Sequence, residues 1–174
     1  QSQKVGDGEE WVFNYTYNRL GKQSSITYPS GKKIKYHYNG KGFMDYVKDA
    51  ATGDVLWQAK SSDCWDNISS FTEGDIDVDY SYNPITGLVN NIVATQNSQI
   101  ILDQSYHWTT TGNLDWRTDA TLDLKESFGY DGFNRLTSVV AKNVDGNITY
   151  FNQSFGYDYN GNITGKTGVG SYSY

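Results

Sequence analysis

The feature that most constrains this chain is a short sequence pattern that recurs along its length. In each copy, a stretch in which the residue type alternates ends at an anchor position. The anchor is aromatic in all copies but one. In most copies Asp or Asn follows the anchor, and Gly or Asn comes three residues after that. The anchors are Tyr17, Tyr38, Ser62 (a degenerate copy), Tyr82, Trp108, Tyr130 and Tyr157. They lie about 23 residues apart on average, a spacing typical of units that stack on their neighbours.

The residue types within one copy predict a β-hairpin. Aromatic residues two positions apart, such as Tyr36 and Tyr38, lie on one face of a strand. The Asp or Asn after the anchor favours the first position of a type I turn, and the Gly favours its last. Six residues past the anchor an apolar residue recurs, except for Gln23 in the first copy: Met44, Ile68, Leu88, Leu114, Leu136 and Ile163.

Segments after the turns, such as residues 89–93 and 136–140, alternate and are rich in β-branched residues. Further turns are predicted between the copies, at residues 29–31, 52–54, 73–75 and 145–147. No stretch has a convincing helical period. We therefore predict an all-β fold, an antiparallel sheet of tandem strand-turn-strand units.

The composition limits the classes of function. Aromatic residues make up 16% of the chain, with 15 Tyr, which suits sheet faces lined with rings. The net charge of −6 argues against nucleic-acid binding, which calls for a basic patch. No apolar run approaches the roughly 20 residues of a membrane span, so membrane insertion is not expected. Cys64 is the single cysteine, which excludes a disulfide within the chain.

Residues that could carry chemistry are few. Asp75, Asp77 and Asp79 alternate and would share one strand face, where they could hold a hard cation or serve as paired carboxylates. A solvated strand face that discourages edge pairing is the commoner explanation, and we favour it. His37 and His107 lack the spacing of zinc ligands. We predict no catalytic residue, no metal and no cofactor.

Tryptophan side chains are the candidates for ligand contact. Most aromatic residues follow the repeat period and are expected to pack as cross-strand pairs. Trp57 and Trp65 break the period, so they are the better candidates for stacking against sugar rings.

The repeat core resembles the YD repeat of RHS proteins. The residues that carry the resemblance are Tyr-Asp-Gly-Phe-Asn-Arg-Leu at 130–136 and Tyr-Asp-Tyr-Asn-Gly-Asn-Ile at 157–163. Asn-Pro-Ile-Thr-Gly-Leu at 83–88 is similar to a frequent longer form of the same motif. The resemblance marks Tyr17, Tyr38, Tyr82, Trp108, Tyr130, Asp131, Tyr157, Asp158 and Gly161 as repeat-defining structural residues.

This family includes bacterial polymorphic and insecticidal toxins of the RHS and Tc type, wall-associated proteins and animal teneurins. The resemblance implies a long sheet that spirals into a hollow β-shell. In the toxins this shell encloses a C-terminal effector; other members act in surface contact, and carbohydrate binding has been suggested. The Asp-Pro motif with which toxin members cleave themselves has no counterpart here, because the only prolines follow Tyr28 and Asn83.

These observations lead to one main hypothesis and one alternative. Residues 1–174 are expected to form a single array of about seven repeats, a fragment of a much larger protein. Its expected function is non-catalytic: a wall segment of a secreted or surface-exposed bacterial protein that encapsulates a polypeptide effector or supports contact with a cell-surface partner. The alternative is a carbohydrate-binding module on the same scaffold. The isolated chain is expected to self-associate.

Residues within a repeat should differ in how much they contribute to stability. The anchor ring of Tyr130 is predicted to be buried and important for stability. Asp119, in contrast, is predicted to contribute little.

Overall fold

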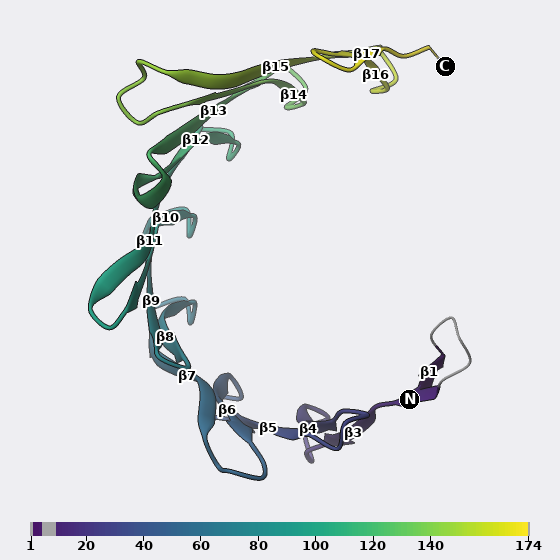
Figure 1. The fold of residues 1–174 in the computed structure, drawn as a ribbon, viewed down its shortest axis with the longest axis vertical. Helices are drawn as coiled ribbons and strands as arrows, with labels where there is room; N and C mark the ends of the chain where they lie inside the picture. The colour runs from purple at the N-terminus through teal and green to yellow at the C-terminus, as the bar shows by residue number, and fades with distance from the viewer. Residues whose placement is uncertain (1, 5–9, 174) are drawn as a thin grey trace. The chain divides into compact units, whose positions relative to one another are not determined.

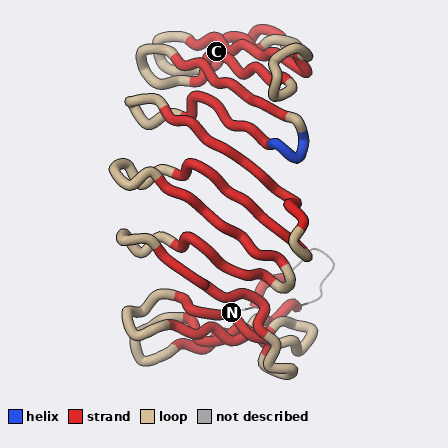
Figure 2. The backbone as a smooth tube through the Cα atoms, turned by 90° about the vertical axis from the view of Figure 1, so that its left-hand side faces the viewer, coloured by secondary structure: helices blue, strands red, loops and turns tan. Residues whose placement is uncertain are grey.

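A computed structural model describes residues 2–4 and 10–173, and strands dominate it. Figure 2 shows the strands joined by loops, with one short helical turn. The larger sheet has fifteen strands, and their order in the sheet is their order along the chain, β3 to β17. The prediction of an all-β antiparallel sheet is confirmed. The chain divides into two compact units, residues 1–78 and 79–174.

Unit 1 contains a separate two-stranded sheet and the first strands of the larger sheet. The small sheet pairs β1 with β2 in antiparallel fashion. The strands of this unit are β1 (Ser2–Lys4), β2 (Glu10–Val12), β3 (Asn14–Tyr17), β4 (Gln23–Thr27), β5 (Lys33–Tyr38), β6 (Met44–Asp49), β7 (Val55–Ser62) and β8 (Ile68–Glu73). Strand β9 (Ile76–Tyr82) crosses the boundary between the units.

Unit 2 holds the remaining strands, which lie side by side in chain order (Figure 1). They are β10 (Val89–Gln96), β11 (Gln99–Trp108), β12 (Leu114–Asp119), β13 (Leu124–Tyr130), β14 (Leu136–Lys142), β15 (Thr149–Tyr157), β16 (Ile163–Lys166) and β17 (Gly170–Ser171). A single 3₁₀ turn, η1 (Ala120–Leu122), joins β12 to β13. This turn was not predicted from the sequence; the side chain of Asp119 caps it by accepting the backbone N–H groups of Thr121 and Leu122.

Strand ends coincide with the repeat pattern. Each anchor is the last residue of a strand, from Tyr17 in β3 to Tyr157 in β15. The next strand begins six residues later, or seven in the copy with the longer turn at residues 83–88. The predicted turns at residues 29–31, 52–54 and 145–147 lie between strands, and of the turn predicted at 73–75 the first residue, Glu73, ends β8 while Gly74 and Asp75 form the turn. The two-residue turn at Asn97 and Ser98, where both residues have positive φ, was not predicted.

The hairpin turns show why Asp or Asn follows the anchor. Asp131 accepts the backbone N–H of Asn134 at its carbonyl, which closes a turn at 3.0 Å. Its side-chain Oδ1 accepts the N–H groups of Phe133 and Arg135 at 2.9 and 3.0 Å. Asp158, Asp63, Asn18 and Asn39 make the same pair of side-chain bonds in their own turns. In the copies with the shorter turn the fourth residue after the anchor has positive φ, which explains its preference for Gly or Asn, and in the longer turn this place is taken by Gly87.

A β-bulge recurs at the same place in the repeat. In the hairpin of β13 and β14, Tyr130 pairs with Leu136 but Gly129 pairs with Ser138, which leaves Thr137 as the extra residue. The same shift gives one extra residue in five other hairpins, namely Ser24, Asp45, Ser69, Asp115 and Thr164. The extra residue is always small and polar or acidic, so the bulge places a polar side chain at each turn end.

Unit 2 consists of one sheet layer, so its core differs from that of a globular domain. In unit 2, contacts between described elements join consecutive strands, together with η1 and β11. The only buried apolar residues among those described are Ile26, Ala94 and Ala141, and no large side chain is fully buried. Apolar burial therefore takes place between neighbouring side chains on one face of the sheet and not between layers.

Candidate functional site: the two faces of the sheet

The strand register separates the side chains of each unit into two faces, because cross-strand partners share a face. The face that carries the anchors, here called the aromatic face, holds most of the aromatic and aliphatic side chains, together with polar ones such as Arg117, Glu126 and Gln153. In unit 1 it includes Tyr15, Tyr17, Ile26, Ile34, Tyr36, Tyr38, Met44, Val47, Trp57 and Phe71. In unit 2 it includes Ile92, Tyr106, Trp108, Leu114, Phe128, Tyr130, Leu136, Val139, Phe151, Phe155 and Tyr157.

The opposite face, here called the polar face, is rich in hydroxyl groups and charges. It includes Thr16, Ser25, Lys35, His37 and Lys48 in unit 1. In unit 2 it includes Ser105, His107, Thr118, Lys125, Ser127, Ser138 and Lys142. Each unit is therefore an amphipathic layer: one face resembles half of a protein core, and the other resembles an ordinary protein surface.

The anchor side chains hold neighbouring repeats together. The hydroxyl of Tyr130 donates to the backbone carbonyl of Leu114 at 2.9 Å, and Leu114 belongs to the previous repeat. The hydroxyl of Tyr157 donates to the carbonyl of Leu136 at 2.7 Å. Tyr38 makes the equivalent bond to Gln23 at 2.8 Å, and the indole N–H of Trp108 donates to Val89 at 2.7 Å. The polar ends of these four anchors thus bond their repeats to preceding ones, while their rings pack on the aromatic face.

The turns are joined in a similar way. The guanidinium of Arg135 pairs with Asp131 in its own turn at 2.7 Å and donates to the carbonyl of Asp158 in the next turn at 2.9 Å. The side-chain amide of Asn113 donates to the side chain of Asn134 at 2.8 Å. These bonds give a structural reason for the polar residue at the fifth position after the anchor.

Bulge residues on the polar face pair with the residue before the anchor. His37 contacts Asp45 at 3.2 Å, and His107 contacts Asp115 at 2.9 Å. Thr16 bonds to Ser24 at 2.8 Å. Where Gly156 precedes the anchor, an added Cβ would meet the hydroxyl of Thr164 at 3.2 Å.

Both histidines therefore have structural partners, and each also stacks on a ring of the next strand. His37 lies on Tyr46 with ring centroids 4.3 Å apart, and His107 lies on Trp116 at 5.4 Å. No group of three residues that could hold a metal ion occurs in the part of the chain that the structure describes. Within the three-aspartate segment, Asp77 forms an ion pair with Lys60.

The two tryptophans predicted to contact sugars lie apart from each other in different surroundings. Trp57 is in the middle of β7 on the aromatic face, half-buried, and packs on Phe71 with ring centroids 5.7 Å apart. Trp65 lies in the turn after β7 and is 66% exposed. The structure does not bring them together into one site.

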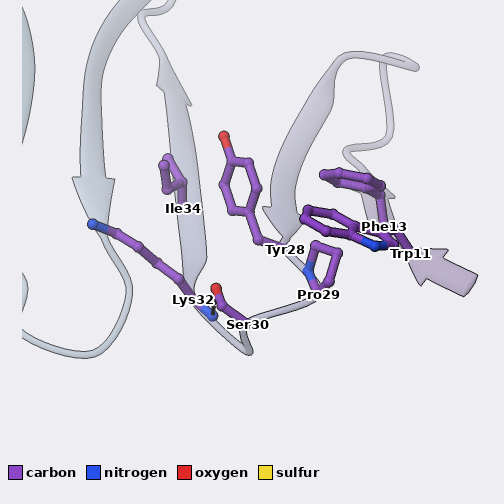
Figure 3. Close-up of a pocket in the computed structure, with 7 residues that line it drawn as sticks. All are labelled: Trp11, Phe13, Tyr28, Pro29, Ser30, Lys32 and Ile34. Carbon is purple, nitrogen blue, oxygen red and sulfur yellow. Dashed lines mark hydrogen bonds between the residues drawn. The ribbon is translucent and has the colours of Figure 1, made fainter. Parts of the chain in front are cut away.

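An aromatic groove that sequence reasoning missed lies in unit 1. It has a volume of about 650 Å³ and is lined mainly by Trp11, Phe13, Tyr28, Pro29 and Ile34. Figure 3 shows the rings of Trp11 and Phe13 on one side of the groove and Ile34 on the other. Phe13 meets the edge of the Tyr28 ring at 5.9 Å. Trp11 follows no repeat spacing, so the sequence offered no signal for this groove.

The prediction that Asp119 contributes little rested on its being an ordinary surface residue, and that premise was wrong. The residue is only 6% exposed. Its carboxylate accepts a bond from Gln104 at 3.1 Å and a bond from the Thr121 hydroxyl at 2.5 Å, besides capping η1. Short polar residues at the end of a strand pattern are often helix caps, and this signal could have identified it.

Turn carboxylates make the stability of the chain sensitive to acid. The pKa of Asp131 is lowered mainly by the backbone N–H of Arg135, and those of Asp63 and Asp158 mainly by the side-chain amides of Asn67 and Asn162. A carboxyl group whose pKa is lower in the folded chain than in the unfolded chain stabilises the fold above its unfolded pKa, about 3.9. This stability is lost as the pH falls through the pKa of the folded chain. The midpoint of urea unfolding is therefore expected to fall between pH 5 and pH 2 in this chain.

A matched variant tests whether these carboxylates cause the acid sensitivity. In two other repeats this turn position is occupied by Asn18 and Asn39. Their side-chain oxygens accept the same two backbone bonds but do not titrate. The triple variant Asp63→Asn, Asp131→Asn, Asp158→Asn should fold and lose stability less steeply in acid. An unchanged pH dependence would show that other groups control it.

Comparisons with solved structures find the same arrangement of strands. A chain of the Photorhabdus luminescens Tc holotoxin pore matches with a TM-score of 0.73 and 18% identity, over 90% of this chain and 9% of the toxin chain. A chain of the TcdB2-TccC3-Cdc42 structure matches with a TM-score of 0.73 and 17% identity, over 96% of this chain and 10% of the other. This chain has the fold of the matched segments of these chains.

The resemblance to YD-repeat proteins of the RHS and Tc type is thus confirmed at the level of the fold. The chain spans about a tenth of the length of the Tc toxin chains that it matches. No family model matches the sequence, and no curated protein is significantly similar to it. No helix in the described residues is long and apolar enough to cross a membrane.

Proposed function

We propose that the chain is a non-catalytic wall segment of a larger, secreted or surface-exposed bacterial YD-repeat protein, and that its aromatic face contacts an enclosed polypeptide. The observation that carries the proposal is the aromatic face itself. It belongs to a sheet of one layer, so side chains that would form the core of a sandwich have no second layer over them in unit 2.

Two further observations support this function. Anchors and turns bond successive repeats in the C-terminal half of the chain, as a wall that must keep its strand order requires. In both units the anchors end strands with the same turn chemistry, so we propose that residues 1–174 form one repeat array. The Tc toxin chains share this fold, and the resemblance to their family implies a shell around an effector.

Binding of an unfolded polypeptide tests the proposal. Fluorescently labelled, reduced and carboxymethylated α-lactalbumin, which stays unfolded, would be titrated with the purified chain and its anisotropy measured. We expect saturable binding, because exposed rings of the aromatic face offer apolar area to an extended chain. Phe151, which is 44% exposed on this face, provides the variant, and Phe151→Asn should weaken binding several-fold.

The neighbouring residue on the same strand gives the control. Asn152 is exposed on the polar face, so Asn152→Ser should leave the affinity unchanged. Absence of saturable binding would overturn the proposal. Equal losses in the two variants would place the contact elsewhere than on the aromatic face.

A carbohydrate-binding module remains the second candidate, because Trp65 is exposed and the groove of Trp11, Phe13 and Tyr28 presents ring surfaces. A glycan array on the chain separates the two candidates. A saturable glycan signal that Trp65→Ala or Trp11→Ala removes would favour this function. Trp57→Ala is a poor test, because its ring packs on Phe71 and its loss would disturb the sheet.

A further inference from the structure

Two lysines on the polar face of unit 2 occupy opposite positions on neighbouring strands. Lys125 in β13 and Lys142 in β14 are direct cross-strand partners. Directly opposite side chains have Cβ atoms about 5 Å apart, and like charges in this arrangement destabilise a sheet. In the part of the chain that the structure describes, the ion pairs of Lys and Arg involve other residues, Lys32, Lys41, Lys60, Arg117 and Arg135.

These lysines line a groove between the strands and the loop that follows β14. The groove has a volume of about 440 Å³ and is also lined by Ser127, Val140 and residues 143–146. The Ser127 hydroxyl is a further donor at this surface. Asp145 also lines the groove, and the carboxylate of Asp123 accepts the backbone N–H of Val144 in the same loop at 3.0 Å, so the ammonium groups are the donors of a groove that also has acidic neighbours.

The first of the two ammonium groups is held in place by an aromatic ring. The Nζ of Lys125 lies 4.9 Å from the centroid of the Trp116 ring, a cation–π distance. Trp116 stands on β12, between His107 on β11 and Lys125 on β13, and stacks on the imidazole of His107. This contact lies on the β12 side of β13, so the Lys125 ammonium has to leave the ring to reach an anion on the side of Lys142.

We propose that this groove binds a tetrahedral oxyanion, a phosphate or sulfate group, between the ammonium groups of Lys125 and Lys142. Such a group has several acceptor oxygens and can accept a charge-assisted bond from each lysine, with Ser127 as a third donor. The bound anion would also relieve the repulsion between the two lysines. The inference rests on unit 2 alone and does not depend on the proposed function.

Titration calorimetry on the whole chain tests the site, with inorganic phosphate, sulfate and glycerol phosphate as probes and chloride to match the ionic strength. We expect one saturable site per chain. Lys142→Gln should weaken binding at least about tenfold, since one bond to a charged group contributes roughly 1.5–3 kcal/mol. Tighter binding of glycerol phosphate than of inorganic phosphate would assign the site to an esterified phosphate, and the reverse order to the free ion; either order supports the proposal.

A second lysine pair serves as the control. Lys35 and Lys48 are also cross-strand partners, on the polar face of unit 1, and Lys48 lies 4.5 Å from the Tyr46 ring. The variant Lys35→Gln, Lys48→Gln removes two charges from another place and should leave the affinity unchanged. If it reduced binding as much as Lys142→Gln does, the effect would be one of net charge, and the proposal would fail. Absence of saturable binding by all three anions would also overturn it.

Thermal unfolding gives an independent readout that detects a folding defect. Without added anion, Lys142→Gln should unfold at the same temperature as the parent chain or slightly higher, because it removes a like-charge contact. Phosphate should raise the unfolding temperature of the parent chain and not that of the variant. A parent chain that phosphate does not stabilise relative to chloride would contradict the proposal.

Discussion

Replacing Tyr130 by Ala is expected to lower the free energy of unfolding by about 2–4 kcal/mol. A fully buried aromatic ring replaced by Ala costs about 3–5 kcal/mol, but the Tyr130 ring is only half-buried in a sheet of one layer. Loss of its hydroxyl bond to the carbonyl of Leu114 adds about 0.5–1.5 kcal/mol. Urea unfolding followed by circular dichroism measures the change.

A tyrosine of the same motif provides the matched control. Tyr159 lies in the turn after β15 and is 95% exposed, so Tyr159→Ala should change the free energy of unfolding by less than about 0.5 kcal/mol. Tyr130→Phe keeps the ring and should cost about 1 kcal/mol, which isolates the bond to the preceding repeat. If Tyr130→Ala and Tyr159→Ala had equally small effects, the anchors would be surface residues and not joints between repeats.

The positions of the strands could be predicted because the turns that end them are local. The hydrogen-bond donors to Asp131 are the backbone N–H groups of Phe133, Asn134 and Arg135. All three lie within four residues of it, so the motif alone specifies the turn. The positive φ of Asn134 follows from the same local chemistry. A repeat whose turn is specified by neighbouring residues also fixes where its two strands begin and end.

Contacts between repeats could not be read from the sequence in the same way. The acceptor of the Tyr130 hydroxyl, Leu114, lies in another repeat, and only the register of the sheet brings the two together. That register includes a bulge at Thr137, a single small polar residue of a kind too common in this chain to mark a bulge by itself. The sequence therefore predicts the units well and the bonds that join them poorly.

The candidate binding residues show the same limit. Trp57 and Trp65 both break the repeat period, but the pattern could not separate a ring that packs on Phe71 from one that points into solvent from a turn. The pairing of Lys125 with Lys142 depends on a register that spans the turn at residues 131–135. Side chains that meet across strands are set by the sheet, so their chemistry becomes visible only in the structure.

The isolated chain is expected to self-associate at micromolar concentration, because its aromatic face would otherwise remain in water. Exposed apolar side chains on this face include Tyr17, Phe151 and Ile163. The edge strands add unpaired N–H and C=O groups that favour pairing between chains. The net charge of −6 opposes association, but salt shortens this repulsion to about 8–10 Å at physiological ionic strength. Association should therefore strengthen as salt rises.

Light scattering over a series of protein and salt concentrations tests this expectation, and two double variants identify the surface involved. Phe151→Asn with Ile163→Asn removes apolar area from the aromatic face and should raise the concentration needed for association several-fold. Ile85→Asn with Phe133→Asn removes similarly apolar side chains that are exposed in hairpin turns, and it should have little effect. An unfolded polypeptide that binds the aromatic face should compete with association and return the chain to monomer. A chain that stays monomeric at every concentration and salt level would mean that its aromatic face has too little exposed apolar area to drive contact, and the proposed binding of a polypeptide would lose its physical basis.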